Sequence, residues 1–574
     1  MKIIKMVLIA VILVAAYLLF LQWQMDYGAQ SIPSNQNALS GQNGANLSTS
    51  DAKDQTTTID NLDANADDTS ANVLLSAVPG AASVRTASAA TAKKTIAIET
   101  DTIQAKIQLE GGNIVHLALK DFQKTLNNPQ PLVLMDDQAF IYTMQSGLIG
   151  PDGTDQQAQL PIYTAQTDSY RLQPGEDSLE VMLSYRTADG LAVDKIYRFT
   201  RNSHLIDLRY RIKNTGNQVK SINLYGQIKH DGRAHHEPTS AFGIKPYLGG
   251  ALTTSEDHYQ KISFADMQDT NLRKQVQGGW IALVQHYFVG SWIPDKEDTY
   301  WYQTRVTANN DYILGFVGPQ KQMQPGQELF LSADFYAGPK KHKILSAISD
   351  HLELTVDYGW LWFISQPLFW LLHWIHDYVG NWGWSIVLLT LFIKLCFFHL
   401  SATSYKSMAK MRQLGPKLTR LREQHGNDRQ AFSKEMMAIY KKEKINPLGG
   451  CLPIVVQMPV FIALYWTLLE SVELRHAPFI FWIQDLAVMD PYFILPILMG
   501  ASMFLQQQLS PTPMGDPIQV KIMKFLPLIF TVFFLWFPAG LVLYWLVNNI
   551  LSIAQQWVIT RQIEKQAAKK GARA

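Results

Sequence analysis

The sequence predicts a membrane protein with five core transmembrane helices, an N-terminal anchor helix and a large exported all-β domain between them. Three observations predict this class. Only 17% of the 574 residues are charged, well below the roughly 25% of a soluble domain. Long apolar runs stand at the N-terminus and after residue 380, whereas the segment between them alternates apolar with polar residues. A wholly soluble protein is therefore excluded.

The overall charge and the cysteine content exclude two further classes. The net charge of +2 comes from 50 basic and 48 acidic residues, which is too balanced for a polyanion-binding protein read as a whole. The two cysteines, Cys396 and Cys451, exclude a disulfide framework and a thiolate metal cluster.

Residues 1–25 are predicted to form the anchor. Lys2 and Lys5 precede the apolar run 6–21, which its neighbours extend towards the roughly 20 residues that cross a bilayer. A cleaved signal peptide is the alternative, but its apolar core would be shorter and would end at small residues. This run ends in Gln22 and Trp23, which favours an uncleaved helix.

The next two segments differ in composition. Residues 26–91 are rich in Ser, Asn, Gln and Ala and nearly free of aromatic side chains, so they cannot repay the entropy of ordering and are predicted to form a flexible linker. Residues 92–345 alternate apolar with polar side chains, as in 195–199, and turn residues such as those at 214–216 separate the runs. This pattern predicts a large antiparallel β-sandwich.

The exported domain shows no motif for bond chemistry. Its densest group of potential ligands runs from His230 and Asp231 to His235, His236 and Glu237. Adjacent histidines in a strand point to opposite faces, and the spacing matches no helix-based zinc motif. We interpret the group as a polar loop and predict no metal, no cofactor and no enzyme activity.

Residues 346–381 are predicted to form an amphipathic helix in the membrane interface. The segment is rich in Trp, which prefers the headgroup zone, and Pro367 and His373 stand among its apolar residues. A further membrane span is the alternative. Spanning here would invert the orientation of every later loop, so we prefer the interfacial helix.

Five apolar segments follow, and together they outgrow any soluble core. They are 382–400, 451–469, 492–506, 525–537 and 539–560. We assign 382–564 to the membrane core, with the loop 401–450 inside it and a basic tail at 565–574. Basic residues outnumber acids in that loop and tail, so the positive-inside rule places both in the cytoplasm together with the N-terminus. Residues 26–381 are then exported.

Lys394 is the most informative residue of the core. A lysine near the bilayer centre costs roughly 2.5 to 3.5 kcal/mol, and no acidic partner lies within any predicted span. Snorkelling to the cytoplasmic interface is one explanation. The other is a hydrophilic groove open to the cytoplasm. Any single polar residue of its walls is also suited to holding helices together, but several from different spans favour a shared cavity. The groove candidates besides Lys394 are Thr390, Gln457, Gln506, Asn548 and Ser552.

Three function classes compete for this core. A channel or carrier usually shows internal repeats or paired ionisable residues near mid-membrane, and the sequence shows neither. An exported enzyme on a membrane stalk lacks a catalytic motif. A single cation in an apolar bundle favours transient binding of a polypeptide with acidic or polar residues, which lowers the barrier to inserting its apolar span.

The loop 401–450 is predicted to form two antiparallel helices. Apolar residues recur at intervals of three and four on both sides of a turn at Gly426 and Asn427. Met-rich faces bind varied partners, and basic residues suit acidic lipid headgroups or ribosomal RNA. A self-packed hairpin with a solvated basic face is the alternative. The candidate contact residues are Lys406, Met408, Lys410, Met411, Arg412, Lys417, Arg420 and Arg422.

Four ungapped stretches carry a family resemblance. They are 355–369 (TVDYGWLWFISQPLF), 407–412 (SMAKMR), 446–461 (NPLGGCLPIVVQMPVF) and 533–544 (FFLWFPAGLVLY). These stretches closely resemble the YidC/Oxa/Alb family of membrane protein insertases, in its Gram-negative form with a large periplasmic domain.

The resemblance implies a five-helix insertase core with a hydrophilic groove and a periplasmic β-supersandwich. The implied activity is insertion and chaperoning of inner-membrane proteins in the phospholipid bilayer, alone or beside the SecYEG and SecDF translocon. Nascent membrane proteins are the implied substrates, and ribosomes and targeting factors are expected at the hairpin and tail. The family's groove cation aligns with Lys394, where arginine is usual, so the charge is kept and the bidentate fork is lost. Substrate contacts carry over to Thr390, Tyr544 and Trp545, the last two being usually Tyr-Tyr.

Overall fold

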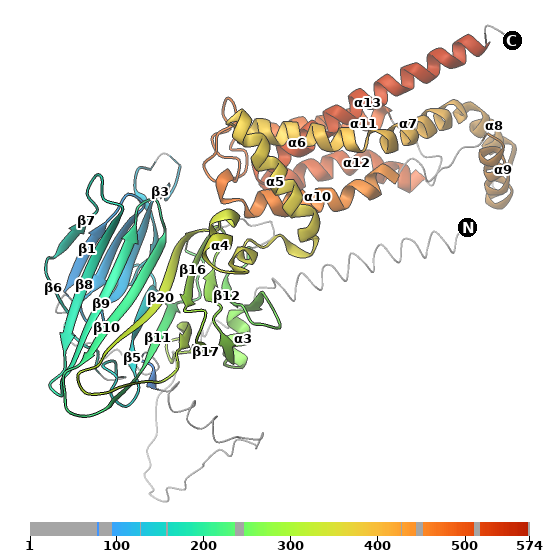
Figure 1. The fold of residues 1–574 in the computed structure, drawn as a ribbon. Helices are drawn as coiled ribbons and strands as arrows, with labels where there is room; N and C mark the ends of the chain where they lie inside the picture. The colour runs from blue at the N-terminus through green and yellow to red at the C-terminus, as the bar shows by residue number, and fades with distance from the viewer. Residues whose placement is uncertain are drawn as a thin grey trace, which may run out of the picture.

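The computed structural model of the chain describes residues 77–79, 94–126, 128–156, 159–235, 246–425, 428–443, 452–509 and 517–571. The predicted anchor 1–25 and nearly all of the predicted linker 26–91 lie outside these residues. Figure 1 shows a β-sheet domain, coloured blue to green, and a helical region, coloured yellow to red, that extends away from it. The expected division into a large β domain and a helical C-terminal region is therefore present.

The β domain consists of two large sheets. Among the described residues, the first sheet has eleven strands. In spatial order they are β14 (Arg273–Gln277), β17 (Thr299–Val306), β18 (Tyr312–Val317), β11 (Lys220–His230), β5 (Tyr142–Ile149), β3 (Asn113–Gln123), β2 (Ile103–Gln108), β1 (Thr95–Glu99) and β7 (Ser169–Arg171), with β19 (Lys321–Met323) beside β11 and β4 (Pro131–Met135) beside β3.

The second sheet has nine strands within the described part of the chain. They are β13 (Gln260–Ile262), β12 (Gly249–Leu252), β15 (Ile281–Val284), β16 (Phe288–Pro294), β20 (Glu328–Pro339), β10 (Leu205–Asn214), β9 (Leu191–Thr200), β8 (Ser178–Arg186) and β6 (Thr164–Ala165). A short helix, α3 (Phe264–Asp269), follows β13. Neighbouring strands run antiparallel, as predicted, but β1 and β7 pair in parallel.

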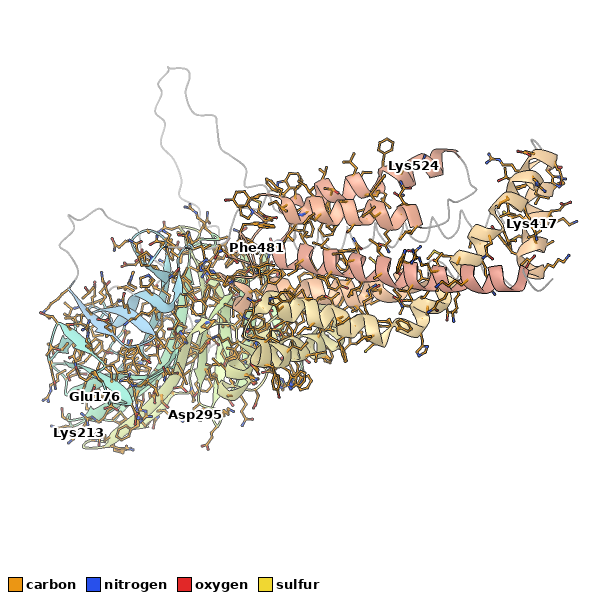
Figure 2. The ribbon with its side chains drawn as sticks, turned by 90° about the horizontal axis from the view of Figure 1, so that it is seen from above. Glu176, Lys213, Asp295, Lys417, Phe481 and Lys524 are labelled. Carbon is orange, nitrogen blue, oxygen red and sulfur yellow. The ribbon has the colours of Figure 1, made fainter. Side chains whose placement is uncertain are left out.

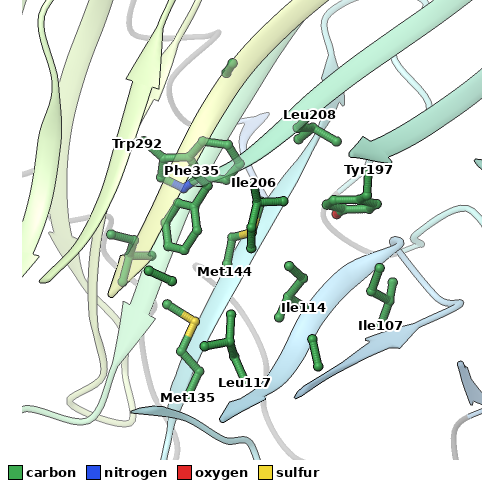
Figure 3. Close-up of a cluster of buried hydrophobic side chains, with 14 of the residues drawn as sticks. Ile107, Ile114, Leu117, Met135, Met144, Tyr197, Ile206, Leu208, Trp292 and Phe335 are labelled. Carbon is green, nitrogen blue, oxygen red and sulfur yellow. The ribbon is translucent and has the colours of Figure 1, made fainter. Parts of the chain in front are cut away.

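The core lies between the two sheets. Along β9 every second side chain is buried, which is the period expected of a strand with one face on a core. Figure 3 shows side chains of both sheets meeting there, with Ile114 and Met144 from the first sheet and Ile206, Trp292 and Phe335 from the second. Alternation in the sequence thus translates directly into a sandwich.

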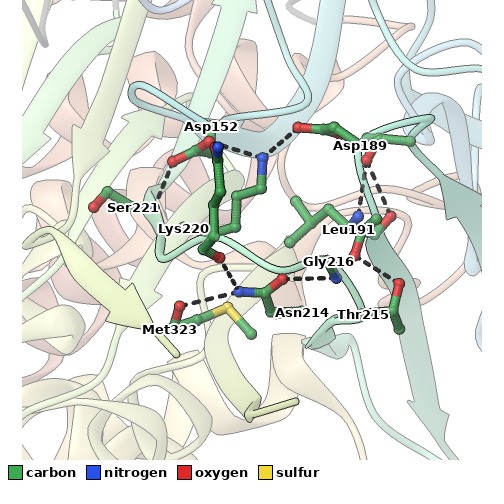
Figure 4. Close-up of polar contacts among 12 residues, drawn as sticks. Asp152, Asp189, Leu191, Asn214, Thr215, Gly216, Lys220, Ser221 and Met323 are labelled. Carbon is green, nitrogen blue, oxygen red and sulfur yellow. Dashed lines mark hydrogen bonds and ion pairs between the residues drawn. The ribbon is translucent and has the colours of Figure 1, made fainter. Parts of the chain in front are cut away.

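Hydrogen bonds and ion pairs connect several turns of the sandwich, as Figure 4 shows. The buried Asn214 at the end of β10 donates to the carbonyl oxygens of Gln218 at 2.7 Å and Met323 at 3.1 Å. Lys220 pairs with Asp152 at 3.0 Å and also with Asp189. Residues 214–216, predicted to form a turn, therefore do so, and the Asn214 side chain hydrogen-bonds to backbone groups around the turn.

The helical region begins after β20. Its elements are α4 (His342–Ile348), η1 (Leu352–Thr355), η2 (Gly359–Leu361), α5 (Trp362–Val379), α6 (Trp382–Cys396), α7 (Phe398–Gln413), α8 (Gly415–His425), α9 (Arg429–Lys442), α10 (Leu452–Glu470), η4 (Val472–Leu474), α11 (Ile494–Leu509), α12 (Pro517–Phe533), η5 (Phe534–Trp536) and α13 (Ala539–Gly571). The segment 346–381, predicted as one interfacial helix, instead contains the end of α4, the two short helices η1 and η2, and α5.

The bundle core is formed mainly by α5, α6, α10, α11 and α13. By length and composition, no single helix in the described ranges is long and apolar enough to cross a membrane. Taken together, α6 and the adjoining part of α7 are long and apolar enough, but a bend of 68° separates them. The predicted span 382–400 is therefore not one straight helix. Its backbone leaves helical geometry at Phe397, where φ is −92° and ψ is 10°.

The sandwich and the bundle are joined by buried polar contacts. Lys340, just after β20, forms an ion pair of 2.7 Å with Glu470 at the end of α10, and both side chains are almost fully buried. The ring nitrogen Nε2 of His286 lies 2.9 Å from the carbonyl oxygen of Leu469. These contacts fix the end of α10 against the second sheet.

Candidate functional site

A group of polar side chains lies inside the helical bundle at Lys394. This residue occupies the last turn of α6, whose first turn is capped by Asn381 accepting from the Trp384 N–H at 3.0 Å. The side chain of Lys394 is only 8% exposed. The last turn of a helix has unpaired carbonyl groups and a partial negative charge, so this position is a favourable one for a buried cation.

Lys394 contacts two other helices through hydrogen bonds. Its Nζ donates to the Ser552 hydroxyl on α13 at 2.8 Å and to the Gln457 side-chain oxygen on α10 at 3.5 Å. The Gln457 amide in turn donates to the Asn548 side-chain oxygen at 2.7 Å, and Ser552 donates to the Asn548 carbonyl oxygen at 2.7 Å. We call Lys394, Gln457, Asn548 and Ser552 the Lys394 cluster.

The charge of the cluster is not neutralised within the described part of the chain. No carboxylate there pairs with Lys394. An ammonium has three donor hydrogens, and only the bond to Ser552 is short, since the contact to Gln457 is at the limit of hydrogen-bond length. The cluster therefore retains capacity to bind an acidic or polar group from another molecule.

The other predicted groove residues are placed differently. Thr390 is buried one turn before Lys394, and its hydroxyl donates within α6 to the Ile386 carbonyl at 2.6 Å. Tyr544 is buried and its hydroxyl hydrogen-bonds to Gln457, so it adjoins the cluster. Trp545 is half-buried, with its ring 4.7 Å from that of Phe461.

Gln506 is half-buried on α11. Three further polar residues of this region were missed by the sequence analysis. Tyr405 on α7 is buried and hydrogen-bonds to Ser552, and Asn549 donates to the Ser502 hydroxyl at 3.1 Å. Asn549 could have been predicted from the sequence, because it stands beside Asn548 in an apolar helix. Tyr405 could not have been predicted, because it lies beyond the predicted span and reaches α13 only through the bend after α6.

The basic loop forms the predicted helical hairpin, with one difference. Leu418 and Leu421 of α8 pack with Tyr440 of α9 in a small apolar cluster. The first predicted helix is divided into α7 and α8, so Met408 packs near Ile559 of α13 instead of within the hairpin. Of the remaining hairpin candidates, Met411 packs against the apolar cluster of α8 and α9. The exposed candidates are Lys406, Lys410, Lys417, Arg420 and Arg422. The side chain of Arg412 is not among those that the structure describes.

The bundle and the sandwich point in opposite directions from their junction. In Figure 2, Phe481 lies at the end of the bundle beside the sandwich, whereas Lys417 lies on the hairpin at the far end. Between these ends, large apolar side chains are exposed on α6 and α12 to an extent that is unusual for a soluble surface. They include Leu388, Leu391, Phe392 and Leu395 on α6 and Phe525, Leu528, Ile529 and Val532 on α12.

One group in the sandwich has metal-ligand chemistry. Ligand atoms of His230, Asp231 and His235 lie within 4.8 Å of one another. Asp231 already accepts from the His235 ring at 2.7 Å and from the Arg233 backbone N–H at 3.1 Å. These are the hydrogen bonds of a polar turn, and His236 and Glu237 lie outside the described residues.

Comparisons with known proteins cover nearly the whole chain. The family model described as "YidC periplasmic domain" matches residues 95–371, and that described as "60Kd inner membrane protein" matches residues 374–566. The membrane protein insertase YidC of Azotobacter vinelandii is 51% identical over 99% of this chain and 100% of its own length. The protein of that name from Pseudomonas fluorescens strain SBW25 is 48% identical over 100% of both chains.

A solved structure of an active YidC insertase, with its first transmembrane domain resolved, overlaps more loosely. It matches 84% of this chain and 95% of its own chain, with 15% sequence identity and a TM-score of 0.37. The assignment of the chain to a family therefore rests on the sequence matches.

Proposed function

This chain belongs to the YidC family of membrane protein insertases, and we propose that the Lys394 cluster is where it receives the polar part of an inserting polypeptide. The chain is an inner-membrane insertase with a large periplasmic β-sheet domain, and its substrates are nascent membrane proteins. It catalyses no bond chemistry. The proposal concerns how the helical region performs the insertion.

One observation carries the proposal. The Nζ atom of Lys394 is directed into the bundle towards Ser552 and Gln457, and no carboxylate of the described residues neutralises it. A buried charge without a counter-ion is unfavourable in apolar surroundings, so an acidic group that enters the bundle relieves this cost. A carboxylate on an inserting chain would gain a charge-assisted hydrogen bond there.

The cluster thereby acts as an intermediate binding site. A polar or acidic flank of the substrate lies at Lys394, in a hydrophilic groove open to the cytoplasm, while its apolar segment contacts the exposed apolar faces of α6 and α12. Moving the apolar segment into lipid then provides the driving force, at about 25 cal/mol per Å² of apolar surface. Tyr544, which adjoins the cluster, and Trp545, which follows it in α13, are also proposed to contact the substrate.

We place α6, α10, α11, α12 and α13 as the five core spans. The uninterrupted apolar segments of the sequence and the exposed apolar faces of α6 and α12 support this placement. Residues 1–25 are proposed as a separate anchor and 26–91 as a linker, and α5 as an interfacial helix. Trp362, Trp370 and Tyr378 on α5 are more than half exposed, as expected of side chains at a headgroup layer.

The hairpin α8–α9 is proposed to face the cytoplasm together with both termini. It stands at the end of the bundle opposite the periplasmic sandwich (Figure 1), and basic residues outnumber acidic ones among its exposed side chains. Ribosomes or targeting factors are proposed partners of the hairpin and of the tail 565–574, and SecYEG and SecDF are proposed partners in the membrane. The proposed boundaries are 92–345 for the periplasmic domain, 346–381 for the interfacial segment and 382–564 for the core.

Insertion by purified protein in liposomes tests the proposal. Two single-span substrates differ only in their exported tails, one acidic and one neutral. We expect Lys394→Ala to slow insertion of the acidic substrate by about tenfold or more, the equivalent of one charged hydrogen bond, and to affect the neutral substrate less. Lys394→Arg should be tolerated because it keeps the charge.

Lys213→Ala, an exposed change on the sandwich, is the control for altered net charge (Figure 2). Equal insertion of both substrates by the Lys394→Ala protein would show that the cation is not the receptor.

A further inference from the structure

A hollow lies where the periplasmic sandwich meets the bundle, and its lining residues are distinct from those of the Lys394 cluster. Its volume is about 760 Å³, and its walls come from α4, α5 and η4. Figure 1 shows α4 and α5 next to each other at this junction. A space of this size accommodates a small ligand or a lipid headgroup.

The hollow lies at the level expected for lipid headgroups. Trp370 and Trp374 of α5 line it, and their side chains are 65% and 49% exposed. Indole rings prefer the boundary between hydrocarbon and water. With α5 placed in the membrane interface, as proposed above, a lipid of the periplasmic leaflet can reach the hollow without leaving the bilayer.

The charged side chains that line the hollow are of both signs. Lys341 and Lys343, from the segment at the start of α4, supply two positive charges. Asp377 near the end of α5 and Glu473 in η4 supply two negative charges. Because two positive and two negative side chains line the hollow, it does not favour a ligand with a charge of one sign only. It favours a ligand that carries both a phosphate and an amine.

The acidic wall has unused hydrogen-bond acceptors. The Nε2 atom of His373 lies 3.5 Å from Oε1 of Glu473. The other two atoms of this pair, Nδ1 of His373 and Oε2 of Glu473, are buried and have no hydrogen-bond partner among the described residues. When Nε2 carries the ring proton, Nδ1 is an acceptor, so both atoms lack a donor, and a ligand with several N–H groups can supply one once either side chain rotates towards the hollow.

We propose that this hollow binds the headgroup of an aminophospholipid. The phosphate lies near Lys341 and Lys343, and the primary ammonium donates to Glu473 and His373 with Asp377 close by. The glycerol and the first part of the acyl chains contact the Trp370 and Trp374 rings. A choline headgroup fits less well, because its methylated nitrogen has no N–H to satisfy the two orphan acceptors.

The lipid would link the two parts of the molecule. The residues that line the hollow come from α4, which follows the last strand of the sandwich, from α5, and from η4, which follows α10. A headgroup that contacts all three stabilises their arrangement at the membrane surface. The inference rests on the proposed placement of α5 in the membrane interface and is independent of the proposed role of Lys394.

Native mass spectrometry of the full-length protein in detergent tests the inference. The probes are phosphatidylethanolamine, phosphatidylcholine with the same acyl chains, and soluble glycerophosphoethanolamine. We expect phosphatidylethanolamine to be retained at least about fivefold more than phosphatidylcholine, and Glu473→Gln combined with Asp377→Asn to remove this preference. Asp350→Asn, at a side chain that is 83% exposed outside the hollow, should leave the preference unchanged.

Equal retention of the two lipids, or a preference that survives the double substitution, would overturn the inference. Occupation by the soluble headgroup at the same concentration as the lipid would also overturn it, because it would show a site for free phosphoamines instead of membrane lipid. A melting curve of each variant establishes that it is folded. If the double variant unfolds, the single change Asp377→Asn at an exposed position must still reduce the preference.

Discussion

The sandwich and the bundle each bury a lysine, and they treat its charge differently. Lys195 in β9 is fully buried, and its Nζ donates to the carbonyl oxygens of Gly111 at 3.0 Å and Ser146 at 2.9 Å. Its ammonium also lies 5.5 Å from the ring centres of Tyr197 and Tyr210. Lys394 has one short bond, to Ser552, and one at the limit of length, to Gln457.

The difference separates a structural charge from the charge that we propose to act in insertion. Lys195 is held between two backbone carbonyls and interacts with the buried Asp155, so nothing remains for a ligand to satisfy. The Lys394 cluster lies among helices whose side chains are exposed on their outer faces, and its ammonium has capacity left over. Stability experiments should therefore respond to Lys195, and insertion experiments to Lys394.

The largest expected effect is on the sandwich. Below about pH 7, where folded Lys195 keeps its proton, Lys195→Ala leaves Asp155 buried without its cation and opens a cavity, so we expect the free energy of unfolding of the sandwich to fall by roughly 3–5 kcal/mol. Urea unfolding of the full-length protein, followed by its strand signal in circular dichroism, measures this. Lys394→Ala should change the same quantity far less. A similar loss from both changes would break the comparison.

A third buried lysine extends the comparison to the junction. Lys340 is matched by Glu470 at 2.7 Å, so it should resemble Lys195 and not Lys394. Lys340→Ala should destabilise the contact between the two parts by about 3 kcal/mol, because Glu470 remains buried and unpaired. Limited proteolysis of the segment 340–361 reports this opening. In a double-mutant cycle, Glu470→Gln should restore part of the loss, and purely additive effects would contradict the pairing.

The pH dependence of the sandwich sharpens the comparison further. Burial lowers the pKa of Lys195 from 10.5 to about 7. Between these values the unfolded chain holds the proton and the folded chain does not. The contribution of Lys195 to the free energy of unfolding should therefore be largest at alkaline pH and should fall as the pH falls towards about 7. Melting temperatures at pH 7 and 9 test this, and Lys195→Met should flatten the dependence.

The smallest expected effect comes from a neutral partner of Lys394. Ser552→Ala removes the short hydrogen bond to the ammonium but leaves the charge, so insertion of an acidic substrate should slow by only a few fold, in keeping with about 1 kcal/mol for one hydrogen bond. The liposome insertion rates described above measure this. The matched control is Ser502→Ala, which removes the partner of Asn549 elsewhere in the bundle. An effect as large as that of Lys394→Ala would transfer the role from the charge to the hydroxyl.

Much of this architecture follows from patterns in the sequence. Alternating residues, as in β9, predicted the sandwich, and the apolar runs predicted the helices that form the bundle. Lys394, Gln457, Asn548 and Ser552 were predicted as neighbours, and hydrogen bonds join them in the structure. The physical reason is that the few polar groups of an apolar bundle must find partners there.

The rest depends on geometry that no local pattern encodes. The bend at Phe397 involves neither proline nor glycine, so Tyr405 could not be predicted to reach Ser552. Thr390 was predicted to line the groove, but its hydroxyl donates to the Ile386 carbonyl oxygen within the same helix. The junction hollow unites residues from α4, α5 and η4, and only the folded chain places Lys343 and Glu473 around one cavity.

Site-specific photocrosslinking tests the central claim most directly. A photoreactive residue is placed at Ser552, beside Lys394, or at Leu391, which is 39% exposed on the outer face of α6. The substrate is a ribosome-stalled chain with an acidic tail. The account predicts that position 552 crosslinks to the acidic tail, that position 391 crosslinks to the apolar segment, and that Lys394→Ala weakens only the former. A tail that never crosslinks to position 552, or does so equally without the cation, would contradict it.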